Sequence, residues 1–372
     1  MKSCPYAHQK QSLTRRQFLK LAGMTAAGLL AASCQPAAVT PSAVPTAAAK
    51  PEPVVAIAKA ANYDPKLIKE QVQAMFENIG GIADVLAHGN RVAIKVNLTG
   101  GVNFPQFPGA PAIESYMTHP AVVRAVVELL RDSGATKISI VEAVVEKESW
   151  SAYGYEEMAK AVDAELVDLS FAEPYKDFAD TASSTDPYYY ESFKFNPILN
   201  EIDAFISISK MKCHNSAGVT HTLKNLFGIV PAKFYALNPQ DVYRSAFHGT
   251  GSKPYKRVPG VIIDLNQARP VNLGIIDGIW TCEGGEGAWV GELTQVKPGV
   301  LIAGKDPVAV DAVATAAMGF KPTTDYPNQP FVNGYNHLNM AYEKGLGTNR
   351  LEEIKVVGAT IDEVKIPFRA SF

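Results

Sequence analysis

Short apolar runs rich in β-branched residues alternate with segments of helical periodicity along most of the chain, and no other feature of the sequence constrains the fold as strongly. Strands buried on both faces appear as continuous apolar runs, and helices connect them in βαβ units. The pattern therefore predicts an α/β fold with three layers, in which a mostly parallel central sheet carries helices on both faces. Strands are expected at residues 54–58, 91–97, 137–142, 165–169, 203–209, 271–276, 300–303 and 354–357.

Helical periodicity fills several of the intervals between these strands. Apolar residues recur at helical spacing over 67–86, 120–130 and 157–162. A further apolar helix is expected over 306–319, with Asp306 as its N-cap, proline at its first position and glycine at its end. No internal repeat is evident, so residues 54–372 are expected to form a single α/β domain.

The N-terminal segment has the pattern of a twin-arginine signal peptide, which we expect to cover residues 1–34. Arg15 and Arg16 are adjacent and are followed by Phe-Leu-Lys and an apolar stretch over 21–32. That stretch is shorter than the ~20 residues that span a bilayer, so it indicates the hydrophobic region of a signal and not a membrane helix. The twin-arginine translocase is therefore an expected partner.

Cys34 follows Ala-Ala-Ser in a sequence that resembles a lipoprotein processing box. Cleavage before Cys34 and its acylation would hold the protein at the outer face of a membrane. The alternative is ordinary cleavage among small residues near 47–49, which would release a soluble exported protein. Residues 35–53 are rich in Ala, Pro, Thr and Ser and are predicted to be a flexible tether, because they cannot bury a core.

Charge and cysteine content argue against several functional classes. The 35 Lys and Arg residues are balanced by 37 Asp and Glu residues, whereas a nucleic-acid-binding surface requires a basic excess. The chain has 4 cysteines and no Cys-x-x-Cys motif, so neither an iron–sulfur cluster nor a structural zinc site is expected. Cys213 and Cys282 could form a disulfide outside the cytoplasm, but sequence does not give their separation.

Ionisable and amide residues fall where several predicted strands end. In open parallel sheets, ligands bind outside the carboxyl ends of the strands. If the predicted strands are parallel, these side chains converge at one edge of the sheet and form a site, although any single one could simply mark a turn. They are Lys95, Asn97, Glu142, Lys210, Asp277, Lys305 and Asp306.

The segment 210–228 holds the largest group of candidate binding residues. A helix is expected to begin at the N-cap candidate Thr220, and His221, Lys224 and Asn225 would share one of its faces. A helix N-terminus beside several lysines attracts anions, so phosphate or a carboxylate is the expected ligand. The predicted substrate-binding residues are Lys95, Asn97, Lys210, Lys212, Lys224 and Asn225.

Histidines supply the candidates for acid–base chemistry, because histidine titrates near neutral pH. These candidates are His119, His214 and His221. Two of them, His214 and His221, could instead ligate a metal, although neither His-x-x-x-His nor His-Glu-x-x-His occurs.

Asp311 is the only charged residue inside an otherwise apolar predicted helix. An unpaired buried carboxylate is costly, so we expect a lysine, a metal ion or backbone donors beside it. A divalent ion held by carboxylates would be Mg²⁺ or Ca²⁺. The carboxylates that could hold it are Glu142, Asp277, Asp306 and Asp311.

A glycine-rich segment follows the strand expected at 271–276. Its glycines do not have the Gly-x-Gly-x-x-Gly spacing, and no Walker motif is present, so the sequence does not support nucleotide binding. The segment is either a lid lined by Glu283, Glu286 and Trp289 or a plain hairpin turn.

Several short motifs occur along the chain in a characteristic combination. They are Lys95-Val96-Asn97-Leu98, Thr118-His119-Pro120, Lys210-Met211-Lys212-Cys213-His214, Thr222-Leu223-Lys224-Asn225-Leu226-Phe227-Gly228, Ile276-Asp277-Gly278-Ile279, Glu283-Gly284-Gly285-Glu286-Gly287 and Gly304-Lys305-Asp306-Pro307-Val308-Ala309-Val310-Asp311. In this combination the chain resembles the "domain of unknown function 362" family from about Val54 to Gly319. Many members carry ferredoxin-type cysteine clusters, which this chain lacks, so the resemblance implies no electron-transfer role here. It implies a domain extent and a shared site, but no established reaction.

Two functional classes fit these features. The leading hypothesis is an enzyme that acts on a small anionic substrate, in which lysines hold the anion, a histidine acts as acid or base, and carboxylates bind a divalent metal or pair with the lysines. The alternative is a lipid-anchored protein that binds an anionic solute or a metal complex without turnover. A structural role in a membrane complex has no supporting motif.

Overall fold

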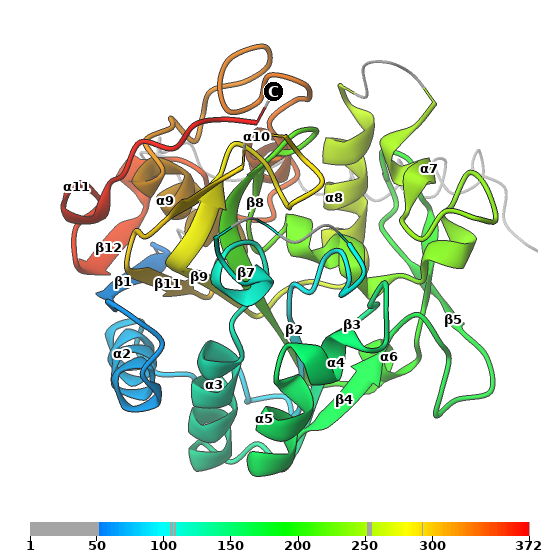
Figure 1. Cartoon of the computed structure of the whole chain (residues 1–372), viewed down its shortest axis with the longest axis horizontal. Coiled ribbons are helices and arrows are strands. Elements are labelled where there is room, and N and C mark those ends of the chain that lie inside the picture. The colour runs from blue at the N-terminus through cyan, green and yellow to red at the C-terminus, as the bar shows by residue number, and fades with distance from the viewer. Residues whose placement is uncertain (1–51, 105–106, 108, 251–254, 292, 372) are drawn as a thin grey trace, which may run out of the picture. The chain divides into compact units, whose positions relative to one another are not determined.

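The computed structural model describes residues 52–104, 107, 109–250, 255–291 and 293–371 (Figure 1). The predicted signal peptide with Arg15, Arg16 and Cys34 lies outside these residues, as does nearly all of the predicted tether. None of the described helices is long and apolar enough to cross a membrane.

The predicted α/β architecture with a mostly parallel sheet is confirmed. Neighbouring strands along the central sheet run parallel, except that β11 is antiparallel to both of its neighbours. Two short strands, β8 (Gly218–Thr220) and β10 (Thr294–Val296), pair antiparallel with the ends of β7 and β9. The strand order is β12 (Lys355–Gly358), β1 (Val54–Lys59), β11 (Val300–Gly304), β9 (Leu273–Glu283), β7 (Ala204–His214), β2 (Arg91–Lys95), β3 (Lys137–Glu142) and β4 (Glu165–Asp168).

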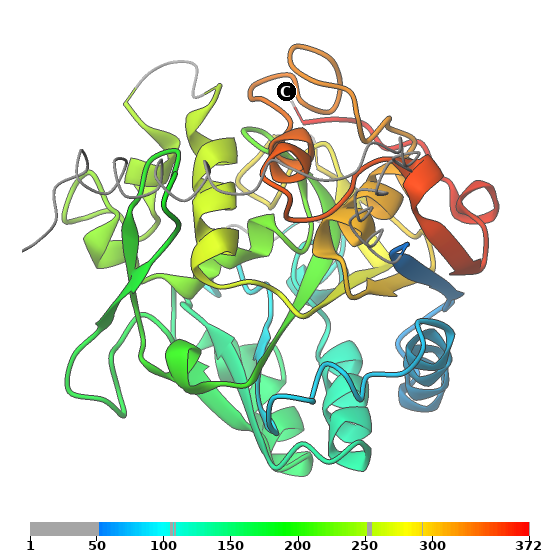
Figure 2. The ribbon, with the colours of Figure 1, turned by 180° about the vertical axis from the view of Figure 1, so that it is seen from behind.

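Helices pack on both faces of this sheet, as Figures 1 and 2 show from opposite sides. Alternate residues of each strand face the two layers. In β2, Val92 and Ile94 pack in one core and Ala93 packs in the other. The first layer contains α2 (Pro65–Asn78), α3 (Pro120–Asp132) and α5 (Tyr155–Ala161), and the second contains α8 (Arg257–Ala268), α9 (Pro307–Ala317) and α10 (His337–Glu343).

Smaller elements occupy the connections. A separate two-stranded antiparallel sheet lies within the stretch after β4 that is rich in aromatic residues and proline. The remaining elements are α4 (Ser149–Ala152), β5 (Ala179–Ala182), β6 (Ser192–Phe195), α6 (Ile198–Glu201), α7 (Ser245–His248) and α11 (Ile361–Val364), with the 3₁₀ helices η1 (Ala112–Glu114), η2 (Lys224–Ile229), η3 (Ala232–Phe234) and η4 (Leu351–Glu353).

Three expectations from the sequence are wrong in detail. The helix expected over 67–86 ends at Asn78, where two glycines with positive φ follow. Both β7 and β9 continue beyond their expected ends at 209 and 276, so Lys210 and Asp277 lie inside strands. No α-helix starts at Thr220, because this residue ends β8 and the chain then enters the 3₁₀ helix η2.

Candidate functional site

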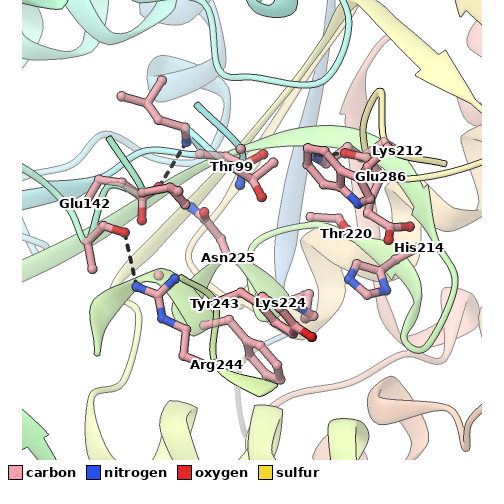
Figure 3. A pocket seen from close by; sticks show the side chains of 18 of the residues that line it. Thr99, Glu142, Lys212, His214, Thr220, Lys224, Asn225, Tyr243, Arg244 and Glu286 are labelled. Carbon is pink, nitrogen blue, oxygen red and sulfur yellow. Dashed lines mark hydrogen bonds between the residues drawn. The ribbon is translucent and has the colours of Figure 1, made fainter. Parts of the chain in front are cut away.

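A cavity of about 440 Å³ lies at the carboxyl ends of β2, β3 and β7 (Figure 3). The 3₁₀ helix η2, the segment 242–248 and the β9–β10 hairpin complete its walls. Figure 3 shows Lys212, His214 and Glu286 on one side of the cavity and Glu142, Asn225 and Arg244 on the other. The sequence-predicted residues that line it are Lys95, Asn97, Glu142, Lys212, His214, Lys224 and Asn225.

A buried ion pair joins the ends of β2 and β3 at the base of this cavity. Lys95 Nζ lies 2.9 Å from Glu142 Oε2 and 3.0 Å from Asn225 Oδ1. A Cβ atom on Gly228 would lie 2.0 Å from Glu142 Oε1, so only glycine fits there. The pair therefore fixes η2 against the strand ends, and the charge of Lys95 is compensated.

Lys212 also has hydrogen-bond partners within the protein. Its Nζ donates to the carbonyl oxygens of Tyr116 at 2.7 Å and Glu286 at 2.8 Å. Burial lowers its pKa to about 8. These contacts attach the β9–β10 hairpin to the end of β7, so the glycine-rich segment is a hairpin that also forms part of the cavity wall.

Lys224 is the lysine of the cavity that lacks an ion pair or hydrogen bond of its amine among the described residues. Its side chain is only 8% exposed, and its Nζ lies 3.5 Å from the centroid of the Phe227 ring. Among the described residues it has no carboxylate within ion-pairing distance and no hydrogen-bond acceptor. Burial lowers its pKa to about 7, with Lys212 and Arg244 acting in the same direction against the opposing effect of Glu286.

The two histidines of the cavity have opposite tautomers. His214 Nδ1 accepts hydrogen bonds from the backbone N–H groups of Ser216 at 3.1 Å and Ala217 at 3.3 Å, so the neutral ring carries its proton on Nε2. His248 Nδ1 lies 3.2 Å from the carbonyl oxygen of Arg244 and must donate to it, which leaves a lone pair on Nε2. Burial lowers the pKa of both rings, that of His248 to about 4. His214 is therefore a donor and His248 a candidate base.

Sequence reasoning missed Arg244 and His248. Arg244 donates from Nε to the carbonyl oxygen of Val230 at 2.9 Å and from Nη2 to that of Ala143 at 3.1 Å. Within the described part of the chain no carboxylate pairs with this guanidinium. Both residues lie in a segment that no strand end, motif or periodicity distinguishes, and only the fold brings them to the cavity.

The cavity has an excess of positive charge and of unmet hydrogen-bonding capacity. Lys95 and Glu142 neutralise each other, so Glu286 is the one remaining carboxylate among the described lining residues, against Lys212, Lys224 and Arg244. The buried Asn97 Oδ1 and Thr220 Oγ1 have no hydrogen-bond partner among the described residues. Aromatic side chains supply apolar wall, namely Phe104, Phe227, Tyr243 and Trp289. These features suit an organic anion with some apolar surface.

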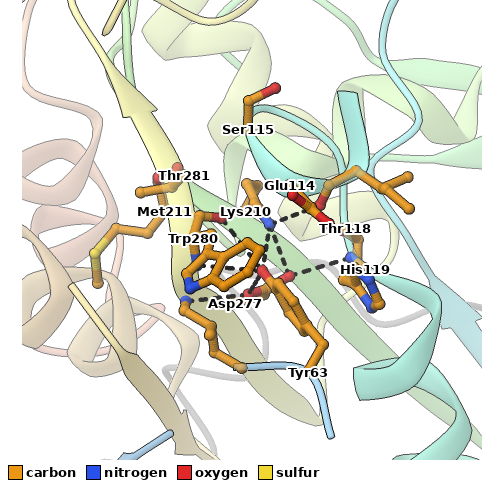
Figure 4. Close-up of polar contacts among 12 residues, drawn as sticks. Tyr63, Glu114, Ser115, Thr118, His119, Lys210, Met211, Asp277, Trp280 and Thr281 are labelled. Atoms are coloured by element: carbon orange, nitrogen blue, oxygen red, sulfur yellow. Dashed lines mark hydrogen bonds and ion pairs between the residues drawn. The ribbon is translucent and has the colours of Figure 1, made fainter. Parts of the chain in front are cut away.

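Lys210, Asp277 and His119 form a separate network that does not line the cavity (Figure 4). Lys210 Nζ donates to Asp277 Oδ2 and to the Tyr63 hydroxyl, both at 2.9 Å. Tyr63 in turn donates to Asp277 Oδ1 at 2.9 Å, and its ring stacks on His119 at 3.7 Å between centroids. The backbone N–H of His119 donates to Asp277 Oδ2 at 3.1 Å. Because these groups satisfy one another, the network fastens the start of α3 to the sheet.

Asp311 and His221 are buried behind the cavity wall. Asp311 accepts hydrogen bonds from the backbone N–H groups of Thr222 at 2.8 Å and Leu223 at 3.0 Å, so backbone donors are its partners. Burial raises its pKa to about 7. His221 Nε2 lies 3.2 Å from Met318 Sδ, so the predicted shared face of His221, Lys224 and Asn225 is wrong.

The carboxylates considered for a metal site lie apart. Asp306 caps α9 and also accepts from the backbone N–H of Thr348 at 3.1 Å. Glu142 and Asp277 are each paired with a different lysine, and Asp311 is occupied as described above. No group of three or more His, Cys, Asp or Glu residues suited to a metal ion occurs within the described ranges.

Cys213 and Cys282 are both free and buried. Although β7 and β9 are neighbours, Cys213 packs in the core beside α9 and Cys282 packs in the core beside α2 and α3. The two thiols therefore face opposite sides of the sheet and do not form the disulfide that the sequence left open.

Comparisons with known proteins show to which family the chain belongs. The family model "Domain of unknown function (DUF362)" matches residues 92–316. The chain belongs to the DUF362 family. The thylakoid-associated protein sll1697 of Synechocystis sp. is similar, with 26% identity over 277 residues that cover 73% of this chain and 76% of the relative.

Among solved structures, the lactate racemase apoprotein from Thermoanaerobacterium thermosaccharolyticum is similar with a TM-score of 0.35 and 12% identity. The match covers 66% of this chain and 54% of the racemase, so this chain spans about half the length of that protein. All residues that line the cavity lie within the DUF362 match.

The uncompensated charge of Lys224 leads to a prediction about stability. The pKa of Lys224 is about 7 in the folded state and near 10.5 in the unfolded state. Its charge therefore lowers the free energy of unfolding by the full amount below pH 7, and this loss becomes smaller as pH rises towards 10.5. We expect Lys224→Met to raise the free energy of unfolding by roughly 2–4 kcal/mol near pH 6 and by much less near pH 10. Urea unfolding across this range measures the difference. The exposed Lys233→Met is the control, and a gain at Lys224 that does not vary with pH would contradict the assignment.

Proposed function

We propose that the protein is an exported enzyme that acts on a small organic anion bound in the cavity. The observation that carries this proposal is a buried cationic group, Lys224, that has no counter-ion among the described residues and lies beside Lys212 and Arg244. Burying a charge without a partner is costly, and a bound anion removes that cost. The position at the carboxyl ends of parallel strands is the usual place for a ligand in an α/β sheet.

The donors of the cavity fit a carboxylate or phosphate group. Lys224 has free N–H groups, His214 presents an Nε2–H donor, and Arg244 retains N–H groups beyond its two backbone contacts. The aromatic wall would contact the carbon skeleton of the ligand. A cavity of about 440 Å³ is in the range for a small metabolite.

Acid–base chemistry favours an enzyme over a passive receptor. A binding protein needs only fixed positive charge, whereas Lys224 has a pKa of about 7 and is partly unprotonated at neutral pH. His248 adds a lone pair on Nε2 in the same cavity. An amine with a pKa near 7 and a free lone pair on a histidine ring, next to an anion site, are typical of a catalytic centre.

We further propose export by the twin-arginine route and attachment to a membrane through an acylated Cys34. The Arg15-Arg16 pair, the short apolar stretch and the small residues before Cys34 support this proposal. The curated relative is named as thylakoid-associated, which agrees with a membrane location.

Anion binding is tested by thermal unfolding of the full chain at constant ionic strength with acetate, propionate, oxalate, phosphate or pyruvate. We expect a saturable rise in melting temperature with at least one of these anions, in the presence and absence of EDTA. Lys224→Met should weaken the apparent affinity about 10-fold or more, because it removes a charge-assisted hydrogen bond. Lys233→Met should leave it unchanged. If no anion gives a saturable rise, or if both variants respond like the wild type, the anion site is refuted.

Membrane attachment is tested by expressing the full chain with Cys34→Ser in a host that has a twin-arginine pathway. The variant is expected to move from the membrane fraction to the soluble exported fraction, because it lacks the acyl chain. Replacing Arg15 and Arg16 by lysine should instead keep the protein in the cytoplasm. Membrane retention of the Cys34→Ser variant would contradict acylation at this residue.

A further inference from the structure

We propose that Lys224 is a nucleophile that forms an imine with the carbonyl group of a 2-oxo acid. This inference rests on the enzyme proposed above and names its substrate class. It follows from how differently the lysines of the cavity are bound, from the charges that surround Lys224, and from the position of His248 in the same cavity.

Lys224 is the lysine of the cavity whose amine is free to react. Lys95 is held by Glu142 and Asn225, and Lys212 is held by two carbonyl oxygens. Among the described residues, the Lys224 amine has no hydrogen-bond acceptor and lies over the face of the Phe227 ring. A ring face stabilises the ammonium form only weakly compared with a carboxylate, so the amine can lose its proton and attack.

The charges around Lys224 favour a carboxylate attached to the reacting carbonyl group. Lys212 and Arg244 line the same cavity as Lys224, and both act to lower the pKa of its amine. The positive charges that suppress protonation of the amine also attract an anion. In a 2-oxo acid the carboxylate is bonded directly to the carbonyl carbon, so one small ligand uses both features.

The chemical step is balanced by groups in the cavity. The lone pair of Lys224 Nζ attacks the carbonyl carbon, a C–N bond forms, and the C=O π electrons move to oxygen. His248 Nε2 can carry one proton from nitrogen to the alkoxide oxygen, which gives the carbinolamine, and then a second proton from nitrogen to the hydroxyl group. That hydroxyl leaves as water and a C=N bond forms, so no oxidant or other co-reactant is required.

The state of the amine agrees with this role. Burial lowers the pKa of Lys224 to about 7, whereas an exposed lysine remains almost wholly protonated at neutral pH. Lysines that form imines are activated in this way, by desolvation and by neighbouring positive charge.

The test uses the full chain with pyruvate as the probe and cyanoborohydride as the trapping reagent. We expect one reduced pyruvate adduct per chain, which peptide mapping by mass spectrometry assigns to Lys224. Its rate of formation should rise as pH increases through about 7, because only the neutral amine reacts. Propionate, which has the carboxylate but no carbonyl group, should slow trapping by competition.

Two variants serve as controls. Lys224→Arg keeps the positive charge and should lose the adduct, whereas Lys233→Arg, at an exposed lysine, should trap like the wild type. Peptide mapping of the wild type decides the assignment even if Lys224→Arg fails to fold.

The outcomes separate this inference from the proposed function. If pyruvate and propionate raise the melting temperature but no adduct forms on Lys224, the imine is refuted and the anion site stands. An adduct spread over surface lysines, insensitive to propionate, refutes the imine as well. If no anion is bound and no adduct forms, both proposals fail.

Discussion

The buried ion pair between Lys95 and Glu142 is the contact on which the site depends. It joins the ends of β2 and β3, and Asn225 and Gly228 bring η2 against it. Removing one partner of such a pair leaves an uncompensated buried charge, which costs about 3–5 kcal/mol. The position of Lys224 follows, because it begins the 3₁₀ helix that this pair holds in place. Asp311 holds the residues just before η2, because it accepts hydrogen bonds from the backbone N–H groups of Thr222 and Leu223.

Buried lysines have two different roles in this molecule. Lys95, Lys210 and Lys212 have well-placed acceptors, so they connect strands, loops and the β9–β10 hairpin. Lys224 is also buried, at 8% exposed, but has no such acceptor among the described residues. The unpaired charge of Lys224, beside lysines that have acceptors, is the feature on which the proposed binding site rests.

The fold could be predicted from the sequence because its signal is local. Apolar runs of strand length and the cap at Asp306 are each read from a few adjacent residues, and β3 has the expected bounds. The placement of Lys95, Asn97 and Glu142 at one edge also followed from the rule for parallel strands. Lys210 and Asp277 broke that rule because β7 and β9 continue past them, which directs both side chains towards Tyr63.

The remainder of the site depends on contacts between distant residues, which a single sequence does not reveal. Asp311 competes with helix formation after Thr220, so periodicity alone misplaced His221. The roles of His214 and His248 depend on which ring nitrogen is already engaged by the backbone. Arg244 reaches the cavity through a loop, where neither spacing nor strand position gives a signal.

A crystal structure of the protein grown with a saturating concentration of oxalate tests most directly whether an anion binds beside Lys224. A bound oxalate is predicted in the cavity, with oxygen atoms within hydrogen-bonding distance of Lys224 Nζ and His214 Nε2. Oxalate bound elsewhere, with only water beside Lys224, would contradict the account.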